Sequence, residues 1–342
     1  MSTPTTSTSS APGTPGEQRI PSGAFFDDLA VGQSYSSPGL TVTDALVATH
    51  RAILGDRTPI ALDTSLAASV VGGGAVAHPG LVWDVVIGQS THFTQRAKAN
   101  LFYRDLALRR LVEVGDTIYT DTEVVALREN RAKEGRHPTG MVALRITAAD
   151  QKGRAIMDFS RCAMLPMSRA GITTGHQDDL LGPGDGVDGG YSRELVAGWD
   201  LTRHPKGTRV EKRDRFVDGH GDVVSSAPEL ARTTLNLAAV HHDVRAAGAQ
   251  RLVYGGHTVG LANAQLAKAF PHLVAVIGWN SCDHLGPVHE NDTVFSTITV
   301  EGVDDVGAHG QLVDFRCQVF KVVDGPPVEV LDWRPRALLA LR

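Results

Sequence analysis

Helical and strand-like periodicities alternate along this chain, and they come in the same order in each half. Apolar residues recur at helical spacing in residues 43–54 and again in residues 258–270. Strict alternation of apolar and polar residues follows at residues 142–147 and 313–319. Helices followed by long antiparallel strands indicate an α+β fold in each half. The simplest packing of these parts is a long helix wrapped by a curved antiparallel sheet.

An internal repeat indicates that the two halves are copies of one module. Residues 112–124 read VEVGDTIYTDTEV, and residues 288–300 read VHENDTVFSTITV. A second pair of segments, residues 55–63 and residues 235–243, keeps almost the same separation along the chain. Two pairs of similar segments that are separated by almost the same number of residues favour a tandem duplication over a chance similarity.

The repeat and the composition divide the chain into four regions. Residues 1–23 are rich in Ser, Thr and Pro, lack the apolar core of a secretory signal, and are expected to form a disordered tail. Residues 24–168 form the expected N-terminal module, and residues 191–342 form the C-terminal one. Residues 169–190 are rich in Gly and lack apolar periodicity, so they are interpreted as an interdomain linker.

Charge and cysteine content narrow the class of protein. The net charge of −5 does not indicate the basic surface that binds a nucleic acid. A local basic patch can still bind an anionic ligand. No apolar run approaches the ~20 residues that span a bilayer, so no membrane association is expected. Cys162, Cys282 and Cys317 are too scattered for a disulfide framework or a zinc site. They are expected to be buried reduced thiols, which fits a cytoplasmic protein; whether two chains pair as a homodimer stays open.

Asn236 and His241 are the first candidates for chemistry. They lie five positions apart, shortly before Asp243, in a stretch that a short loop or helix end could aim into one cleft. Histidine is the side chain best suited to move protons near neutral pH, and an asparagine amide can hold a water molecule. The pair suits the addition of water to a polarised double bond. The alternative is that His241 and its neighbour His242 cap or pack locally.

Paired glycines provide a second candidate feature. Gly255 and Gly256 stand directly before a predicted helix. Glycines let a backbone approach a ligand closely, and the free N–H groups of a helix start can hold an anion or a developing oxyanion. A turn that needs positive φ at these glycines explains the pair equally well.

Several other histidines have more ordinary interpretations. His50 lies on the apolar face of its predicted helix and is expected to pack rather than to bind a ligand. His78 begins the helix that matches the Gly255 region and is interpreted as a remnant of a lost site. His220, His284 and His289 lie in polar, loop-like sequence and are expected to be solvated. No metal-binding quartet and no Gly-rich phosphate loop is visible in the sequence.

Three motifs together resemble the MaoC-like dehydratases, which are hotdog-fold (R)-specific 2-enoyl-CoA hydratases. They are the Asn-x4-His-x-Asp string at residues 236–243, the Tyr-Gly-Gly-His helix start at residues 254–257, and the Pro-Val-x3-Asp-Thr strand entry at residues 287–293. The helix start is most similar to the mesaconyl-CoA hydratase (β-methylmalyl-CoA dehydratase) branch. The resemblance covers nearly the whole chain outside the tail and the linker.

The resemblance implies a double hotdog fold, with two modules forming a pseudo-dimer, and a coenzyme A thioester as substrate with no separate cofactor. It also implies an Asp–His pair in each active module. In the first module Ala61 stands where the His is expected, so Asp56 should lack its proton partner and that half should be inactive. In the second module His241 is present, but Asn236 holds the Asp position. His241 is therefore expected to act as a lone base.

These expectations describe a hydro-lyase that hydrates a 2-enoyl-CoA, or dehydrates a 3-hydroxyacyl-CoA, with a short branched or dicarboxylic acyl group as one option. His241 would activate water, Asn236 would orient it, and backbone N–H groups near Gly255 and Gly256 would hold the thioester oxygen. Supporting positions are assigned to Asp243 and His257. Two alternatives remain: a hotdog thioesterase, which would need a carboxylate near the carbonyl, and a non-catalytic acyl-CoA-binding protein.

Overall fold

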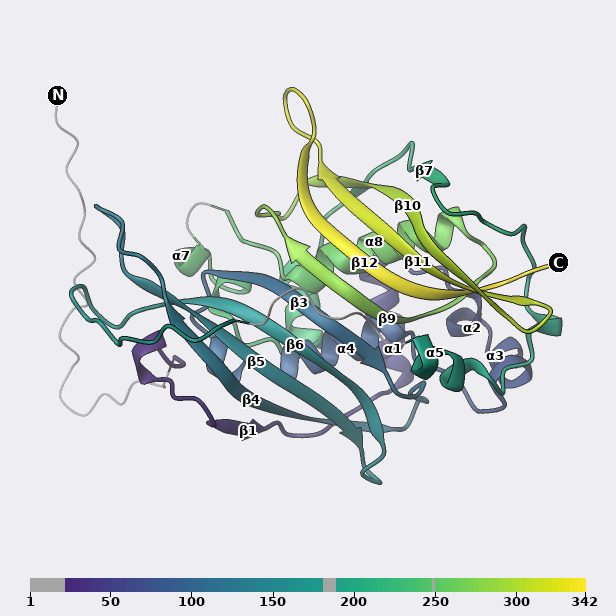
Figure 1. Ribbon diagram of the computed structural model, residues 1–342, viewed down its shortest axis with the longest axis horizontal. Helices are drawn as coiled ribbons and strands as arrows, with labels where there is room; N and C mark the ends of the chain where they lie inside the picture. Colours follow the sequence, from purple (N-terminus) through teal and green to yellow (C-terminus); the bar gives the residue numbers. More distant parts are fainter. Residues whose placement is uncertain (1–21, 181–188, 248–249) are drawn as a thin grey trace.

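A computed structural model describes residues 22–180, 189–247 and 250–342, and these residues build one continuous antiparallel sheet (Figure 1). The sheet has 12 strands in the order β1-β4-β5-β6-β3-β9-β12-β11-β10-β7, with β2 added at β4 and β8 at β10. The first four long strands belong to the first half of the chain and the last four to the second. The two modules therefore meet where β3 pairs with β9.

Each module has two short strands, then short helices, a long buried helix and four long strands. The first contains η1 (Phe26–Asp28), β1 (Ser34–Ser36), β2 (Leu40–Thr41), α1 (Asp44–Leu54), α2 (Pro59–Leu62), α3 (Thr64–Val71), α4 (Pro79–Gln89), η2 (His92–Thr94), β3 (Ala99–Leu108), β4 (Thr117–Glu129), β5 (Thr139–Asp150) and β6 (Ala155–Pro166). The second contains α5 (Gly189–Val196), η3 (Leu201–Arg203), β7 (Arg215–Val217), β8 (Asp222–Val223), α6 (Ala227–Thr233), η4 (Ala239–His241), α7 (Val244–Ala247), α8 (Gly255–Ala269), β9 (Leu273–His284), β10 (Thr293–Val306), β11 (Gly310–Lys321) and β12 (Val328–Ala340).

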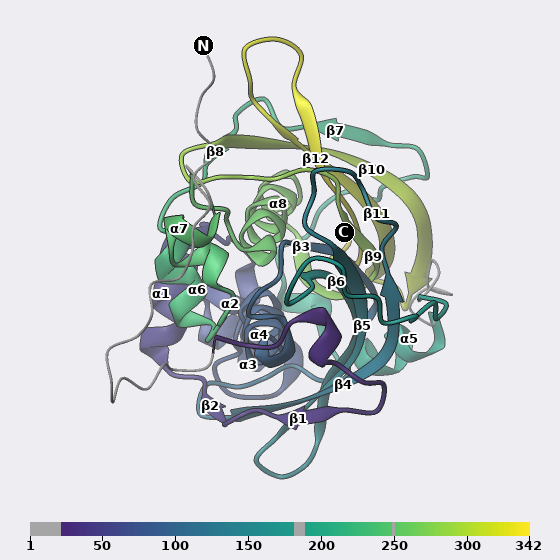
Figure 2. The ribbon, with the colours of Figure 1, turned by 90° about the vertical axis from the view of Figure 1, so that its left-hand side faces the viewer.

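Each module wraps its sheet around one central helix, α4 in the first and α8 in the second (Figure 2). Every residue of α4 is buried, and so are twelve of the fifteen residues of α8. A helix that is covered on all sides has no polar face, which explains why α4 is apolar almost throughout. The α+β architecture and the double hotdog arrangement predicted from the periodicity and the resemblance are confirmed.

An aromatic cluster fills the junction between the modules. Trp83 of α4 packs edge-on against Trp279 of β9 and Trp333 of β12, with ring centroids 5.0 and 6.2 Å apart. All three rings are almost completely buried. Edge-to-face contacts of buried aromatic rings stabilise such a junction beyond the area that they bury. The site described below lies where β3 pairs with β9.

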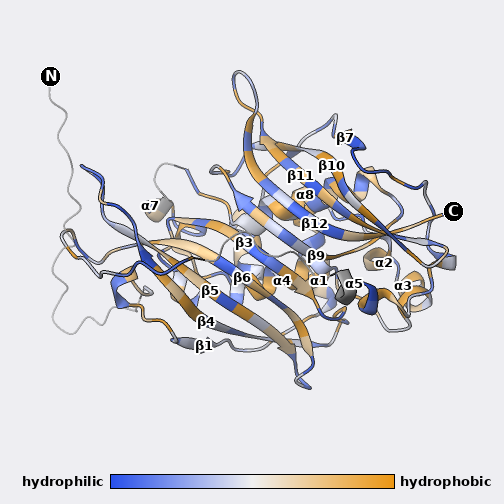
Figure 3. Ribbon diagram, in the orientation of Figure 1, coloured by the Kyte–Doolittle hydropathy of each residue, from blue (hydrophilic) through white to orange (hydrophobic). Residues whose placement is uncertain are grey.

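Local expectations for the helices and strands hold in detail. Thr43 caps α1 by accepting the backbone N–H of Leu46 at 3.2 Å, and His50 is buried on that helix, as expected. Hydrophobic and hydrophilic residues alternate along the long strands (Figure 3). All three cysteines are buried and unbonded to one another. None of the helices within the described residues is long and apolar enough to cross a membrane.

The expected tail and linker are described only in part. Residues 1–21 of the tail and residues 181–188 of the linker lie outside the described residues. The part of the linker that follows β6 runs along the first module, where Glu129 accepts hydrogen bonds from the backbone N–H groups of Thr174 and Gly175. An isolated bridge between Arg128 and Gln177 continues this contact. The first half of the linker is therefore held against β4.

Candidate active site

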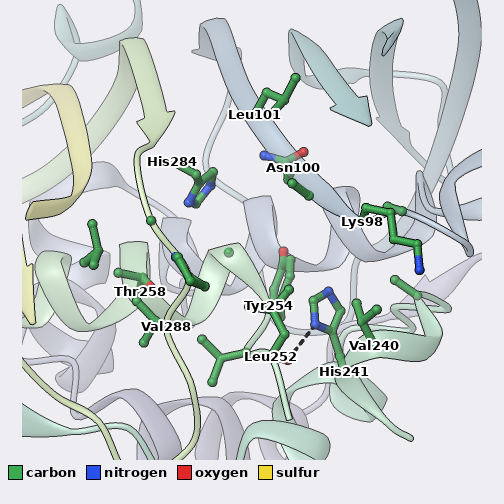
Figure 4. A pocket seen from close by; sticks show the side chains of 18 of the residues that line it. Lys98, Asn100, Leu101, Val240, His241, Leu252, Tyr254, Thr258, His284 and Val288 are labelled. Carbon is green, nitrogen blue, oxygen red and sulfur yellow. Dashed lines mark hydrogen bonds between the residues drawn. The ribbon is translucent and has the colours of Figure 1, made fainter. Parts of the chain in front are cut away.

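A cavity of about 430 Å³ opens at the junction of the two modules. The first module contributes residues within 97–103 and Arg161. The second contributes residues within 236–241, 252–258 and 284–288. A concave, mostly apolar cavity with a few converging polar groups is the usual form of a small-molecule site. Figure 4 shows His241 and Tyr254 on one wall, with Lys98 toward one end and His284 toward the other.

His241 is held with one ring nitrogen fixed and the other directed to the cavity. It ends the short helix η4, and its Nδ1 lies 2.9 Å from the carbonyl oxygen of Leu252, to which it donates (Figure 4). The ring also packs edge-on against Tyr254, with centroids 5.9 Å apart. The donation by Nδ1 leaves Nε2 as an unprotonated acceptor in the cavity lining. Burial lowers the pKa of His241 to about 4, so the imidazole is neutral at physiological pH.

Asn236 lies in the same cavity as His241, as the sequence spacing predicted. It follows Leu235, whose positive φ of 59° turns the chain after α6. The Oδ1 atom of Asn236 accepts the backbone N–H of Ala238 at 2.9 Å, which fixes the orientation of the amide. The side chain is almost fully buried. With Oδ1 occupied, the Nδ2 group is the part of the amide that can donate to a ligand or a water molecule.

The two glycines at the start of α8 have different surroundings. Neither has positive φ, so the alternative that they serve a turn of that kind is wrong. Gly255 lines the cavity, and a Cβ there would lie 2.7 Å from Cε1 of His284. Gly256 is not among the lining residues; a Cβ there would overlap the carboxylate of Asp84 and the ring of Tyr254. The backbone of Gly255 is therefore the part of the helix start that a ligand can approach.

Tyr254 connects this helix start to the first module. As the N-cap residue of α8 it lines the cavity with its ring, while its hydroxyl donates to Oδ1 of Asp84 at 3.1 Å. The other carboxylate oxygen of Asp84 lies 3.0 Å from Nε2 of His50. All three side chains are buried. The position of α8 over the cavity is thus fixed by a hydrogen-bonded chain that begins on α1.

The two positions predicted to support the site lie outside the cavity. Asp243 is paired with Arg245 at 2.7 Å and stabilises the turn into α7. His257 is completely buried within α8, and neither of its ring nitrogens has a hydrogen-bond partner among the described residues. Burial, together with the nearby His50, lowers the pKa of His257 to about 4. Both residues therefore act on local structure rather than on a ligand in this cavity.

Sequence analysis did not mention Arg161, Asn100 or Lys98 among the polar residues of the cavity, and it misinterpreted His284. Arg161 of β6 and Asn100 of β3 come from the first module, and Nε of Arg161 donates to Oδ1 of Asn100 at 2.7 Å. His284 was expected to be solvated, and this expectation is wrong. It ends β9 in pairing with Leu331, and its buried Nε2 has no hydrogen-bond partner among the described residues. Burial lowers the pKa of His284 to about 4, which keeps the ring neutral.

The corresponding position of the first module is a closed pair. Asp56 was expected to lack a proton partner, and this is wrong: its Oδ1 lies 3.1 Å from Nε2 of His78. The hydroxyl of Thr58 also donates to Asp56, at 2.9 Å, and Asn263 of α8 contacts the same His78 nitrogen at 3.1 Å. Burial opposes ionisation of Asp56, but His78 and Thr58 lower its pKa overall. Neither Asp56 nor His78 lines the cavity.

Within residues 22–180, 189–247 and 250–342, no group of three or more His, Cys, Asp or Glu side chains is placed to hold a metal ion. The polar groups of the cavity are neutral imidazoles, amides, hydroxyls, the guanidinium of Arg161 and the ammonium of Lys98. Such a set can accept a proton from water, orient that water, and bind an oxyanion or a carboxylate.

The fold and the cavity at the seam of its modules define a double hotdog protein. No protein-family model matches the chain. A solved structure of a conserved hypothetical protein from Mycobacterium tuberculosis, described as essential for survival during infection and as a double hotdog, is 45% identical, covering 94% of this chain and 99% of that one, with a TM-score of 0.86. The chain belongs to the same double-hotdog family as that protein.

Two characterised relatives extend the comparison. β-Methylmalyl-CoA dehydratase of Chloroflexus aurantiacus is 25% identical, with 84% of this chain and 86% of the relative covered. Mesaconyl-CoA hydratase of Cereibacter sphaeroides is 24% identical, with 80% and 81% covered. The structure of a MaoC-domain dehydratase from Chloroflexus aurantiacus is 21% identical with a TM-score of 0.82, over 95% of this chain and all of that one, and shares the fold. The predicted resemblance to the MaoC-like dehydratases is confirmed.

Proposed function

We propose that this protein is a hydro-lyase that reversibly adds water to the double bond of a 2-enoyl-CoA thioester. The observation that carries the proposal is His241, a neutral imidazole with Nδ1 fixed on Leu252 and Nε2 left for a ligand, beside the amide of Asn236 in one cavity. The names of the two characterised relatives, both acting on CoA esters, support the same chemistry.

The geometry suits a stepwise addition of water. Nε2 of His241 takes a proton from a water molecule held by the Nδ2 group of Asn236, and the water oxygen attacks C3 of the enoyl group. The electrons of the double bond move toward the thioester oxygen, where the backbone N–H at Gly255 and the start of α8 stabilise the developing charge. The protonated His241 then returns a proton to C2. Read in reverse, the same steps dehydrate a 3-hydroxyacyl-CoA.

Hydration fits the lining better than thioester hydrolysis does. A hotdog thioesterase was expected to need a carboxylate near the carbonyl. Among the described residues that line the cavity, none is an Asp or a Glu. The carboxylate of Asp84, which contacts the cavity residue Tyr254, is outside the lining and also contacts His50. Water activation therefore depends on His241.

Lys98 is the anchor that we assign to the coenzyme A portion, at one end of the cavity. Lys98 is exposed, lines the cavity, and extends from the start of β3 on the side away from His284 (Figure 4). A flexible ammonium group at a cavity mouth suits the phosphates of coenzyme A. The acyl group would then point inward, past His241.

The test is a panel of 2-enoyl-CoA esters incubated with the purified protein and analysed by mass spectrometry for the gain of one water. His241→Gln should reduce kcat by roughly 10²- to 10⁴-fold, the usual contribution of a general base. His220→Gln, a change in an exposed loop, is the matched control and should keep activity. Full activity in His241→Gln would contradict the proposal. Release of free thiol would indicate a thioesterase, and tight binding without turnover would indicate a non-catalytic acyl-CoA-binding protein.

A further inference from the structure

Arg161 is a buried cation with only neutral partners. The residue is 4% exposed and lines the cavity. Its Nε donates to Oδ1 of Asn100 at 2.7 Å, and its Nη1 donates to the hydroxyl of Ser90 at 3.2 Å. A guanidinium carries five N–H donors, so Nη2 and one proton of Nη1 remain for another acceptor. The two protein contacts hold the side chain in place without neutralising its charge.

Other arginines of the same sheet are neutralised by carboxylates. Arg104 of β3 pairs with Asp283 at 2.7 Å, and Arg336 of β12 pairs with Asp314 at 2.8 Å. Across the described ranges, Arg161 takes part in no ion pair with an Asp or a Glu. A charge removed from water is costly unless an opposite charge or several hydrogen bonds compensate it. A buried, oriented and unpaired guanidinium in a cavity wall is therefore a site for an anionic ligand group.

The position of Arg161 identifies the part of the ligand that it meets. Arg161 lines the same cavity as His241 and His284, whose pKa values are lowered mainly by burial and further by the positive charge of Arg161. Lys98 is exposed and suits the coenzyme A phosphates at the mouth. The anion at Arg161 must therefore be carried by the acyl chain.

We propose that Arg161 binds a carboxylate on the acyl chain and makes the enzyme specific for CoA esters of dicarboxylic acids. This inference rests on the proposed function, because it assigns the substrate class of the same site. A carboxylate matches the planar donors of a guanidinium and can accept two hydrogen bonds from it. The first module, in which Asp56 and His78 form a buried pair outside the cavity lining, would thus supply the specificity of the site in the second.

The test compares two 2-enoyl-CoA esters of equal length, one ending in a carboxylate and one in the carboxamide. We expect kcat/KM of the wild type to favour the carboxylate by about 10- to 100-fold, the range of charge-assisted hydrogen bonds. Arg161→Gln should bring this ratio close to one, and Arg161→Lys should keep part of it. Arg145→Gln is the control, since Arg145 pairs with Asp158 outside the cavity lining and should keep the wild-type ratio. A wild type without any preference overturns the inference, whether or not the variants fold.

A binding experiment separates this inference from the proposed function. Calorimetry is run with the matched saturated CoA esters and with free coenzyme A, none of which can react. Tighter binding of the carboxylate ester by the wild type but not by Arg161→Gln supports the inference even if no enoyl ester is hydrated. If Arg161→Gln weakens the binding of free coenzyme A to the same extent, the coenzyme A phosphates bind at Arg161. That result would overturn the inference. Hydration without any carboxylate preference would leave the proposed function intact and overturn the inference alone.

Discussion

Asp56 and His78 form a carboxylate–imidazole pair in the first module, with Oδ1 and Nε2 3.1 Å apart. The pair is buried, and Asn263 of α8, the central helix of the other module, contacts His78. In the second module the arrangement is reversed: His241 lines a cavity, and none of the described residues in that lining carries a carboxylate. One module thus keeps a closed pair, and the other keeps an open imidazole.

The closed pair should matter for stability and not for catalysis. Asp56→Asn removes the charge that His78 and Thr58 contact, so the free energy of unfolding should fall by about 2 kcal/mol. Because neither Asp56 nor His78 lines the cavity, kcat/KM of the folded variant should stay within a few-fold of wild type. Urea unfolding and steady-state kinetics measure the two effects. Asp324→Asn, in an exposed turn, is the control for stability. A large loss of kcat/KM in folded Asp56→Asn would contradict this division.

The pH profile should reveal the neutral state of His241. Its pKa is lowered to about 4, mainly by burial, so the base form predominates above that pH. We expect kcat/KM to be level from neutral pH down to about pH 5 and to fall only as the pH drops through about 4. Arg161→Gln removes a positive charge near the ring and should move this limb to higher pH. A wild-type limb near the ordinary histidine pKa of about 6.5 would show that His241 is not held neutral by burial.

The repeat and the motif spacing predicted much of the fold and the centre of the site. The two modules follow directly from segments that recur at one separation, because a duplicated sequence repeats its hydrophobic pattern and therefore its elements. The five-residue spacing of Asn236 and His241 was enough to place both in one cleft, since a loop and a single helical turn join them. Local sequence carries these features.

Arg161 and His284 show what local sequence does not carry. Arg161 lies in an ordinary strand pattern, and only the pairing of β3 with β6 and β9 brings it beside residues from the other half of the chain. His284 follows a polar run and precedes Leu285, Gly286 and Pro287, which is typical of a loop. It is nevertheless held in β9 by pairing with β12. Both residues join the cavity through contacts between distant strands.

Acid should destabilise the protein partly through His257. Its pKa is about 4 in the folded protein, because of burial and the nearby His50, and about 6.5 when unfolded. The unfolded chain therefore binds the proton first as the pH falls. The stability from His257 is complete above about pH 6.5 and is lost as the pH falls toward 4, at about 1.4 kcal/mol per pH unit.

The variant His257→Leu should make this loss shallower. It removes one titrating group and two buried ring nitrogens that lack hydrogen-bond partners among the described residues. Stability at pH 7 should therefore be equal to or higher than that of wild type, since an unpaired buried polar group is unfavourable. Urea unfolding between pH 4.5 and pH 7.5 measures the slope, with His220→Gln as the exposed control. An unchanged slope in His257→Leu would mean that His257 is already protonated or solvated in the folded protein.

Substitution of Gly255 should affect the cavity more than the stability. A Cβ at this position would lie 2.7 Å from Cε1 of His284, so the ring must move within the cavity. Alanine is otherwise favoured over glycine in a helix by about 1 kcal/mol, which offsets part of the crowding. We expect Gly255→Ala to keep a near-normal Tm while kcat/KM falls by roughly 10-fold, a loss of about 1.4 kcal/mol in transition-state stabilisation. Gly256→Ala, which crowds Asp84 in the packed core, should instead lower stability by about 1–3 kcal/mol. Adding His284→Ala to Gly255→Ala removes the clash, so a Gly255→Ala defect that persists in the double variant would show that crowding of His284 is not its cause.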